Sequence, residues 1–292
     1  KVLEKEHIIG FYKDQIVDLK KNDKVKVRKY DKDLVFDIVK RYKPEYLYYF
    51  AGYHHSSEEK PEDDLNLIEK SNFTHFILYS YFLEALKEYS HHTKVFYSAS
   101  SLIFGNPACN VQDESTPINP VCIYGITKAS GLFLGRYYRN KYSLFISNGI
   151  LYNHESEYRG ERFLFPKVIK TAYDIKIGRK DKLEIGDLNS ITDWGYAYDY
   201  VYAMIKILNL SSPDDFIIAT GEGHTVREFL EIVFSRLGLD YRDYVSQNKR
   251  LIVRKKPVLI GNPTKLIEKT GWQRSLSFKE MVIKIMEDVK NE

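Results

Sequence analysis

Three tyrosines in this sequence are each followed four residues later by a lysine. The pairs are Tyr124 with Lys128, Tyr137 with Lys141, and Tyr202 with Lys206. One helical turn separates the members of such a pair, so each ammonium could lie beside a phenol and favour its phenolate form. A phenolate can accept the proton of an alcohol during oxidation. Because the chain contains 24 tyrosines, the spacing alone does not select one pair.

The sequence around Tyr124 and Lys128 favours that pair. It begins a predicted helix after a loop with two prolines, and it follows a predicted strand, residues 94–99, that runs into Ser100 and Ser101. Ligands of parallel α/β sheets bind at the carboxyl ends of the strands. We therefore predict Ser100, Tyr124 and Lys128 as catalytic residues and Ser101 as a substrate contact. The alternative is that the pair merely decorates a helix.

Apolar runs rich in β-formers alternate with longer helical patterns along the chain. The predicted strands are residues 7–12, 46–50, 94–99, 143–148 and 216–220, and the predicted helices are residues 33–43, 65–89 and 124–142. Such alternation is typical of βαβ units. It predicts an α/β fold with a doubly wound, Rossmann-like parallel sheet.

The chain of 292 residues is long enough for a main domain with a smaller one attached. The pattern becomes less regular after Asn153. We therefore expect a dinucleotide-binding domain over residues 1–152 and a mainly substrate-binding α/β subdomain over residues 153–292. Residues 193–220 are expected to return partly to the first domain.

The expected opening of a doubly wound dinucleotide fold is a strand followed by a Gly-rich turn that holds the pyrophosphate. Residues 1–6 instead resemble the end of the first helix, and residues 7–12 the second strand. We therefore expect that the first βα unit, roughly 20 to 25 residues, is missing upstream. The alternative is a natural fold without a cofactor. The missing Gly-rich turn also leaves open a different class, a catalytically silent NAD(P)-sensing or scaffold protein.

The strand end and the Tyr124–Lys128 pair together resemble the extended short-chain dehydrogenases. From Asn148 onward the chain is similar to the GDP-mannose 4,6-dehydratases. The matching segments are residues 148–156 (NGILYNHES), 193–195 (DWG) and 214–229 (DDFIIATGEGHTVREF). The resemblance implies that Tyr124 takes the proton of a sugar 4-hydroxyl while the C4 hydride passes to nicotinamide. It also implies that Lys128 lowers the phenol pKa and that Ser100 holds O4.

The sequence departs from the dehydratases at one position next to this site. Those enzymes carry a glutamate two positions after the catalytic hydroxyl residue, and it removes the C5 proton; here the residue is Leu102. Leucine accepts no proton. We therefore predict oxidation of a GDP-mannose-type hexose or heptose to its 4-keto sugar without dehydration, as in the GDP-heptose 4-dehydrogenases of capsular heptose synthesis. A 4-epimerase and a 4,6-dehydratase remain open alternatives.

Substrate contacts follow from the same resemblance, which implies a GDP-linked sugar. Asn153 and Lys167 are expected at the nucleotide diphosphate, with Arg227 and Arg254 as further phosphate ligands. Arginine suits this role because its planar fork meets phosphate oxygens bidentately. The alternative places Lys167 and Arg227 on solvated faces. Thr192 stands where the dehydratases usually carry an arginine, which removes one phosphate contact.

The expected cofactor is NAD. NADP-using dehydratases place two arginines after the second strand, whereas this chain has Lys13 and Asp14. A carboxylate there favours a ribose 2′-hydroxyl and repels a 2′-phosphate. The small residues Ala51 and Gly52 would allow the backbone to approach the cofactor closely.

Composition excludes several other classes of protein. The net charge of +4 is largely spread along the chain, which gives little support for nucleic-acid binding. No run approaches the roughly 20 apolar residues of a membrane span, and the start lacks the apolar core of a signal peptide, so we expect a cytoplasmic protein. Cys109 and Cys122 are too few for a disulfide framework, and no metal site is predicted. By resemblance, the helix that starts at Tyr124 would form the interface of a homodimer or homotetramer.

Overall fold

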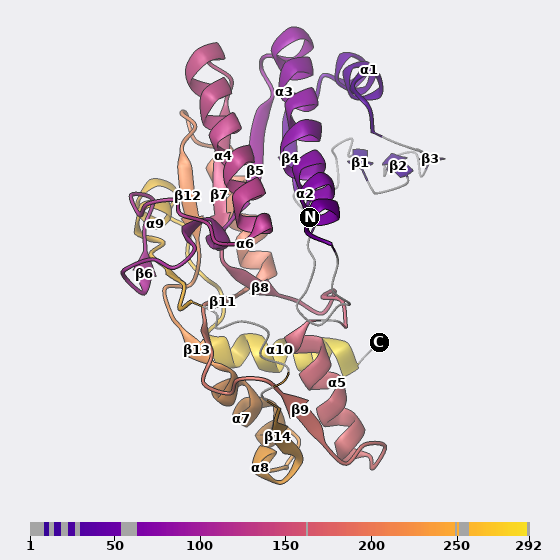
Figure 1. The fold of residues 1–292 in the computed structure, drawn as a ribbon, viewed down its shortest axis with the longest axis vertical. Helices are drawn as coiled ribbons and strands as arrows, with labels where there is room; N and C mark the ends of the chain where they lie inside the picture. The colour runs from indigo at the N-terminus through magenta and orange to yellow at the C-terminus, as the bar shows by residue number, and fades with distance from the viewer. Residues whose placement is uncertain are drawn as a thin grey trace.

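The computed structural model describes residues 9–11, 15–18, 23–26, 30–53, 63–161, 163–248, 250 and 257–290. Its upper part is built on a parallel sheet with the strand order β12-β7-β5-β4 (Figure 1). The strands are β4 (Tyr46–Tyr49), β5 (Lys94–Ser100), β7 (Ile146–Leu151) and β12 (Asp215–Ile218). The predicted Rossmann-like α/β fold is confirmed.

Helices cover both faces of this sheet. One face carries α1 (Lys32–Tyr42), α2 (Asp64–Asn72), α3 (Leu78–Tyr89) and α4 (Ile123–Tyr142), and the other carries α6 (Ala197–Leu208) and α9 (Thr264–Thr270). Neighbouring residues of β5 point to opposite faces, so Tyr97 joins the first core and Phe96 the second. Within the described part of the chain, no helix has the length and apolar character needed to cross a membrane.

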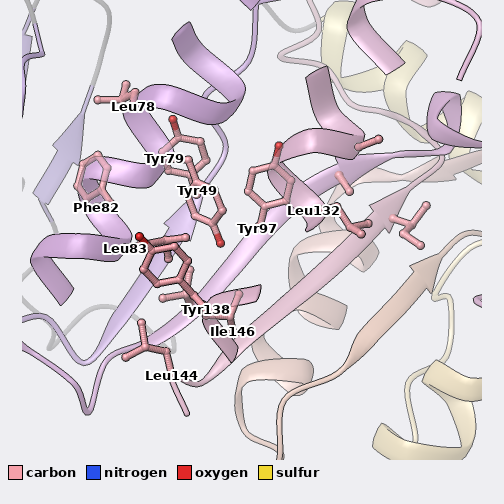
Figure 2. Packing of buried hydrophobic residues seen from close by; sticks show 14 of the residues in the cluster. Tyr49, Leu78, Tyr79, Phe82, Leu83, Tyr97, Leu132, Tyr138, Leu144 and Ile146 are labelled. Atoms are coloured by element: carbon pink, nitrogen blue, oxygen red, sulfur yellow. The ribbon is translucent and has the colours of Figure 1, made fainter. Parts of the chain in front are cut away.

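The first core is unusually rich in tyrosine (Figure 2). Tyr49, Tyr79 and Tyr97 are buried with their rings 4.6 to 5.9 Å apart. The Tyr49 hydroxyl donates to the carbonyl of Thr74 at 2.5 Å, and the Tyr97 hydroxyl donates to the carbonyl of His75 at 3.3 Å. These bonds tie the sheet to the chain between α2 and α3, since a buried hydroxyl needs a partner.

Local sequence explains where the elements end. Asp31 caps α1 by accepting from the Leu34 N–H at 3.0 Å, and Lys43, in the left-handed region at φ 41°, ends that helix before Pro44. The expected single helix over residues 65–89 is interrupted by a π-helical turn, Phe73–Ile77. Such turns add a residue to the helical repeat and leave little trace in hydrophobic periodicity.

The lower part of the molecule in Figure 1 has its own hydrophobic core. It contains α5 (Leu164–Lys176), α7 (Val226–Arg236), α8 (Tyr241–Tyr244) and α10 (Phe278–Lys290), with β9 (Leu183–Ile185) parallel to β14 (Val245–Gln247). Phe165, Trp194, Phe229 and Phe278 stack at its centre. Two strands, β8 (Asn153–Glu155) and β11 (Trp194–Tyr196), pair in parallel between the two parts.

One turn and two pairs of two-residue strands complete the connections. These are the 3₁₀ turn η2 (Ser101–Phe104), β6 (Val111–Gln112) paired with β15 (Ile260–Gly261), and β10 (Ile191–Thr192) paired with β13 (His224–Thr225). The β6 and β15 pairing joins the loop before α4 to the chain before α9.

One predicted strand was placed wrongly. Residues 7–12 were expected as the second strand of the parallel sheet, but β1 (Ile9–Phe11) pairs antiparallel with β2 (Gln15–Asp18), which pairs with β3 (Asp23–Lys26). In the generic doubly wound strand order 3-2-1-4, the second strand of the fold pairs with the first strand of the fold and does not touch the fourth. Among the described residues no strand lies beside the outer edge of β4, and residues 9–11 pair instead with the strand that follows them along the chain.

Candidate active site

Ser100 ends β5 at the carboxyl edge of the sheet. Its register partner in β7 is Leu151, and its extended backbone (φ −147°) leads directly into η2. The Ser100 hydroxyl accepts a hydrogen bond from the Leu102 N–H at 3.3 Å and so caps this turn. Ser101 is buried at the start of the turn. The structure therefore places the Ser100 hydroxyl where ligands of such sheets bind.

The first turn of α4 lies directly on η2. Cys122 caps the helix with its sulfur, which accepts from the Gly125 N–H at 3.4 Å. A Cβ at Gly125 would lie 2.5 Å from the Leu102 carbonyl oxygen, so this close approach requires glycine. As a result, Tyr124 stands next to the turn that follows Ser100.

Lys128 connects three elements of the site. Its side chain is 2% exposed, and its ammonium donates to the Ser98 carbonyl at 2.8 Å and to the Ala51 carbonyl at 3.5 Å. The same nitrogen lies 5.8 Å from the centre of the Tyr124 ring. The predicted residues Ser100, Tyr124, Lys128 and Ala51 are thus gathered at one edge of the sheet.

The charge states in this site differ from the simple picture of an ammonium that stabilises a phenolate. Burial raises the pKa of Tyr124 to about 12, although the positive charge of Arg159 opposes this. Burial also lowers the pKa of Lys128 to about 7. The expected lowering of the phenol pKa is therefore not seen, because desolvation disfavours both charges and Lys128 donates to backbone carbonyls.

Gly52, after β4, keeps the space beside Lys128 free of side-chain atoms. A Cβ there would lie 3.7 Å from the Lys128 nitrogen and 3.6 Å from Nε2 of His75. Both distances are ordinary van der Waals contacts, so a Cβ at residue 52 would not clash. Glycine is therefore not sterically required there, but it leaves the backbone beside the site uncovered. An exposed backbone next to a buried cation fits the close approach of a flat cofactor ring. Asp14, the residue that favoured NAD, lies outside the described residues.

Two polar residues that the sequence left without a role border this site. Glu155 is 4% exposed, and Arg159 Nε lies 3.5 Å from its Oε2. Burial raises the pKa of Glu155 to about 7, and Arg159 opposes this shift as it does for Tyr124. Glu155 lies four residues after the end of β7, in the segment NHES. The sequence did not reveal that its side chain is buried. The second is His75, a histidine in an apolar helical stretch, which is fully buried beside Tyr124.

The predicted substrate residues are more dispersed. Asn153 begins β8 with an exposed side chain, and Lys167 is half-buried on α5. Arg227, on α7, donates to the Tyr241 hydroxyl at 2.9 Å and to Oδ1 of Asn189 at 3.2 Å, within the lower part of the molecule. Arg254 lies outside the described residues. The part of the chain that the structure describes contains no group of three or more His, Cys, Asp or Glu able to hold a metal ion.

Known proteins resemble this chain in sequence. The family model for GDP-mannose 4,6 dehydratase matches residues 6–285. GDP-mannose 4,6 dehydratase 2 of Arabidopsis thaliana is 41% identical over 197 residues, which cover 67% of this chain and 52% of that protein. The chain thus spans about half the length of this curated relative.

Solved structures resemble it in fold. RMD from Pseudomonas aeruginosa, complexed with NADPH, has a TM-score of 0.79 at 17% identity and covers 91% of this chain and 88% of its own. dTDP-glucose 4,6-dehydratase from Bacillus anthracis, in complex with NAD, has a TM-score of 0.75 at 19% identity over 90% and 78% of the two chains. At these identities the likeness concerns the fold alone. The family model, however, spans both the sheet and the lower part of the molecule, so the chain belongs to the GDP-mannose 4,6-dehydratase family of extended short-chain dehydrogenases.

Proposed function

We propose that this protein uses NAD to oxidise the C4 hydroxyl of a GDP-linked sugar. The observation that carries the proposal is the buried Lys128, which joins the ends of β4 and β5 beside Tyr124 and Ser100. A strongly shifted lysine and a buried phenol at a strand end are the pattern of a functional site. Membership of the GDP-mannose 4,6-dehydratase family supports the same oxidation at C4, which is the step that we expect this chain to share with the dehydratases.

In this proposal each residue has one task. The Ser100 hydroxyl hydrogen-bonds O4, and Tyr124, as phenolate, accepts the hydroxyl proton as the C–H bond at C4 breaks. Burial keeps the Tyr124 phenol protonated in the structure described above, so the proposal requires the positive charge of Lys128 to stabilise the phenolate once the sugar is bound. NAD, when bound, accepts the two electrons and the hydrogen of C4 as hydride. Lys128, Ala51 and Gly52 would hold its nicotinamide half, and we propose NAD over NADP because of Asp14.

The fate of the 4-keto sugar depends on a base for the C5 proton. Leu102, at the start of η2, cannot serve, and this favours release of the ketone, as a GDP-heptose 4-dehydrogenase would do. The second candidate is 4,6-dehydration. The curated relatives favour it, and Glu155 is the observation within this structure that supports it, because its buried carboxyl group could accept a proton near neutral pH.

Product analysis of wild type and three variants separates these outcomes. We expect wild type to convert GDP-mannose or GDP-heptose to a product that lacks two hydrogens, and Leu102→Glu to gain loss of water. Leu102→Gln, which has similar size without a base, is the control and should keep the wild-type product. Loss of water by wild type, abolished in Glu155→Gln, would overturn the dehydrogenase assignment in favour of the dehydratase. A product of unchanged mass would indicate the 4-epimerase.

We propose that the lower part of the molecule binds the nucleotide. Asn153, Lys167 and Arg227 are the proposed diphosphate contacts, with Arg254 as a further one. The two hydrogen bonds of Arg227 fix its guanidinium while leaving other N–H donors of the group for phosphate oxygens.

We also propose a division of the chain into two domains. Residues 1–152 form the cofactor domain and residues 153–292 form mainly the substrate domain, with α6 and β12 returning to the sheet.

We also propose that the protein is at least a homodimer through α4. Ile126, Phe133 and Tyr137 are about half exposed and fall on one face of α4, and Leu65 and Ile68 are exposed on the neighbouring α2. Light scattering should give the mass of two or four copies for wild type. Phe133→Glu places a charge in this face and should give one copy. A single copy for wild type would contradict the proposal.

A further inference from the structure

His75 lies at the centre of the π-helical turn between α2 and α3, and it contacts both the catalytic helix and the segment after β4. Its Nε2 accepts a hydrogen bond from the Tyr53 N–H at 3.0 Å. Its Nδ1 lies 2.8 Å from the Thr127 hydroxyl, one residue before Lys128. The rings of His75 and Tyr124 pack edge to face, with their centroids 5.2 Å apart and their planes at 87°.

These contacts assign the protonation state of the imidazole. A backbone N–H can only donate, so Nε2 must present its lone pair to Tyr53. The Thr127 hydroxyl donates to the Ile123 carbonyl at 2.9 Å, and it therefore accepts from Nδ1–H of His75. The ring is neutral in this arrangement. A proton on Nε2 would place two N–H donors against each other and break the bond to Tyr53.

The backbone around His75 is fixed independently of its side chain. The Tyr97 hydroxyl, from β5, lies within hydrogen-bonding distance of both the His75 carbonyl at 3.3 Å and the Lys128 carbonyl at 3.4 Å. The π-helical turn packs against α4, and this turn brings the ring toward Thr127 and Tyr124. Removal of the imidazole should therefore release Tyr53 and the Tyr124 ring while the helices stay in place.

We propose that neutral His75 is a positioning residue that holds residues 51–53 and the ring of Tyr124 in register around Lys128. The proposal rests on the proposed function, because it concerns the same site. Ala51 accepts from the Lys128 ammonium and Tyr53 donates to His75, so the short segment between them is held at both ends. Gly52 in the middle borders both groups, at 3.6 Å from His75 Nε2 and 3.7 Å from Lys128 Nζ for an added Cβ.

Protonation of His75 should therefore loosen the site in acid. Among the described residues, the ionisable groups next to His75 are Tyr124 and Lys128 on α4, Tyr97 on β5 and Tyr53 after β4. One contact further away, Tyr49 donates to the Thr74 carbonyl, Tyr79 packs against Tyr49, and Lys70 donates to the Tyr53 hydroxyl. The tyrosines are neutral at acidic pH, so Lys128 and Lys70 are the charges in this set, and both oppose a further positive charge. The same fall in pH also charges Lys128, so the two events must be separated by mutation.

Three variants test this role. His75→Gln keeps an acceptor for the Tyr53 N–H but does not titrate, whereas His75→Leu removes the acceptor. His91→Leu is the control, since His91 contacts the Tyr142 carbonyl at the other end of α4. We expect His75→Leu to lower kcat/KM for C4 oxidation about 10-fold, the effect of one lost hydrogen bond. His75→Gln should restore it to within about 3-fold, and it should be less sensitive to acid than wild type.

Hydrogen exchange of the Tyr53 amide tests the proposal without relying on turnover. We expect this amide to exchange about 10-fold faster in His75→Leu, and to lose protection below neutral pH in wild type but not in His75→Gln. Protection of Tyr53 that is unchanged in His75→Leu would overturn the proposal, as would identical pH profiles of kcat/KM for wild type and His75→Gln. If wild type oxidises no sugar at C4, the proposed function fails, while the exchange measurement still decides the role of His75.

Discussion

The helix α4 carries two tyrosine–lysine pairs with the same spacing in very different surroundings. Near its exposed end, Lys141 donates to the Tyr137 hydroxyl at 2.6 Å, and this bond lowers the pKa of Tyr137 and raises that of Lys141. At its first turn, burial raises the pKa of Tyr124 to about 12 and lowers that of Lys128 to about 7. The same two residue types are thus shifted in opposite directions.

The comparison shows that the i, i+4 spacing predicts contact but not function. The solvated pair forms the expected bond between the ammonium and the phenol hydroxyl near the last turn of α4. Burial favours the neutral forms of the Tyr124 phenol and the Lys128 amine, and Lys128 lies beside Ala51 and Gly52 at the edge of the sheet. Ionisable groups whose pKa values are strongly shifted by burial are typical of catalytic sites.

Removing one phenol hydroxyl from each pair should give the largest contrast. Tyr124→Phe should lower kcat for C4 oxidation by about 10²- to 10⁴-fold, the usual range for loss of a general base. Tyr137→Phe, on the same helix, should keep wild-type kcat because it touches no predicted substrate or cofactor contact. Steady-state assays of both variants with NAD and GDP-mannose or GDP-heptose would make the comparison. Equal activities would remove the distinction between the pairs.

Replacing each lysine should change the pH dependence of folding stability for the buried pair but not for the exposed pair. The pKa of Lys128 is lowered from 10.5 to about 7, so the unfolded chain binds its proton more tightly between these values. Folding stability should therefore rise with pH in this window, by at most about 1.4 kcal/mol per pH unit for one proton. Chemical denaturation should show that Lys128→Met loses this rise and that Lys141→Met keeps it. A rise of equal size in Lys128→Met would show that Lys128 is not the group that causes this pH dependence.

The close approach of α4 to η2 gives a smaller but specific effect. Gly125→Ala would place a Cβ 2.5 Å from the Leu102 carbonyl oxygen, so the first turn of the helix must move away from Ser100. We expect a loss of about 1–3 kcal/mol in stability, as for other overpacked sites, together with reduced kcat. Asn140→Ala, at an exposed position between Tyr137 and Lys141, should change stability by less than about 0.5 kcal/mol. Urea titration measures both. An unchanged midpoint for Gly125→Ala would mean that the first turn tolerates a side chain.

Much of the sheet was predictable because its strands are apolar runs bounded by turn signals. The predicted strand at residues 94–99 is β5, and the predicted helix at 124–142 is α4 to within one residue. The π-helical turn at residues 73–77 was not predictable, since one added residue barely alters the apolar pattern. The pairing of residues 9–11 also failed, because strand order depends on neighbours that sequence periodicity does not identify.

The candidate site was predictable in its chain positions but not in its electrostatics. Ser100 and Lys128 could be chosen from a strand end and a helix start, whereas the burial that shifts Lys128 depends on Ser98 and Ala51, distant in sequence. Glu155 lay in a segment that had been singled out, yet only its tertiary burial marks it as an ionisable group near neutrality. His75 required the π-helical turn to be known.

The central claim is that the buried pair, and not its exposed counterpart, takes part in oxidation at C4. The most direct test follows the hydrogen at that carbon, with GDP-mannose and GDP-heptose deuterated at C4 and NAD supplied to wild type, Tyr124→Phe and Tyr137→Phe. Deuterium should leave C4 in wild type and Tyr137→Phe and stay in Tyr124→Phe. Turnover by wild type that retains deuterium at C4, or its equal loss in Tyr124→Phe, would contradict the account.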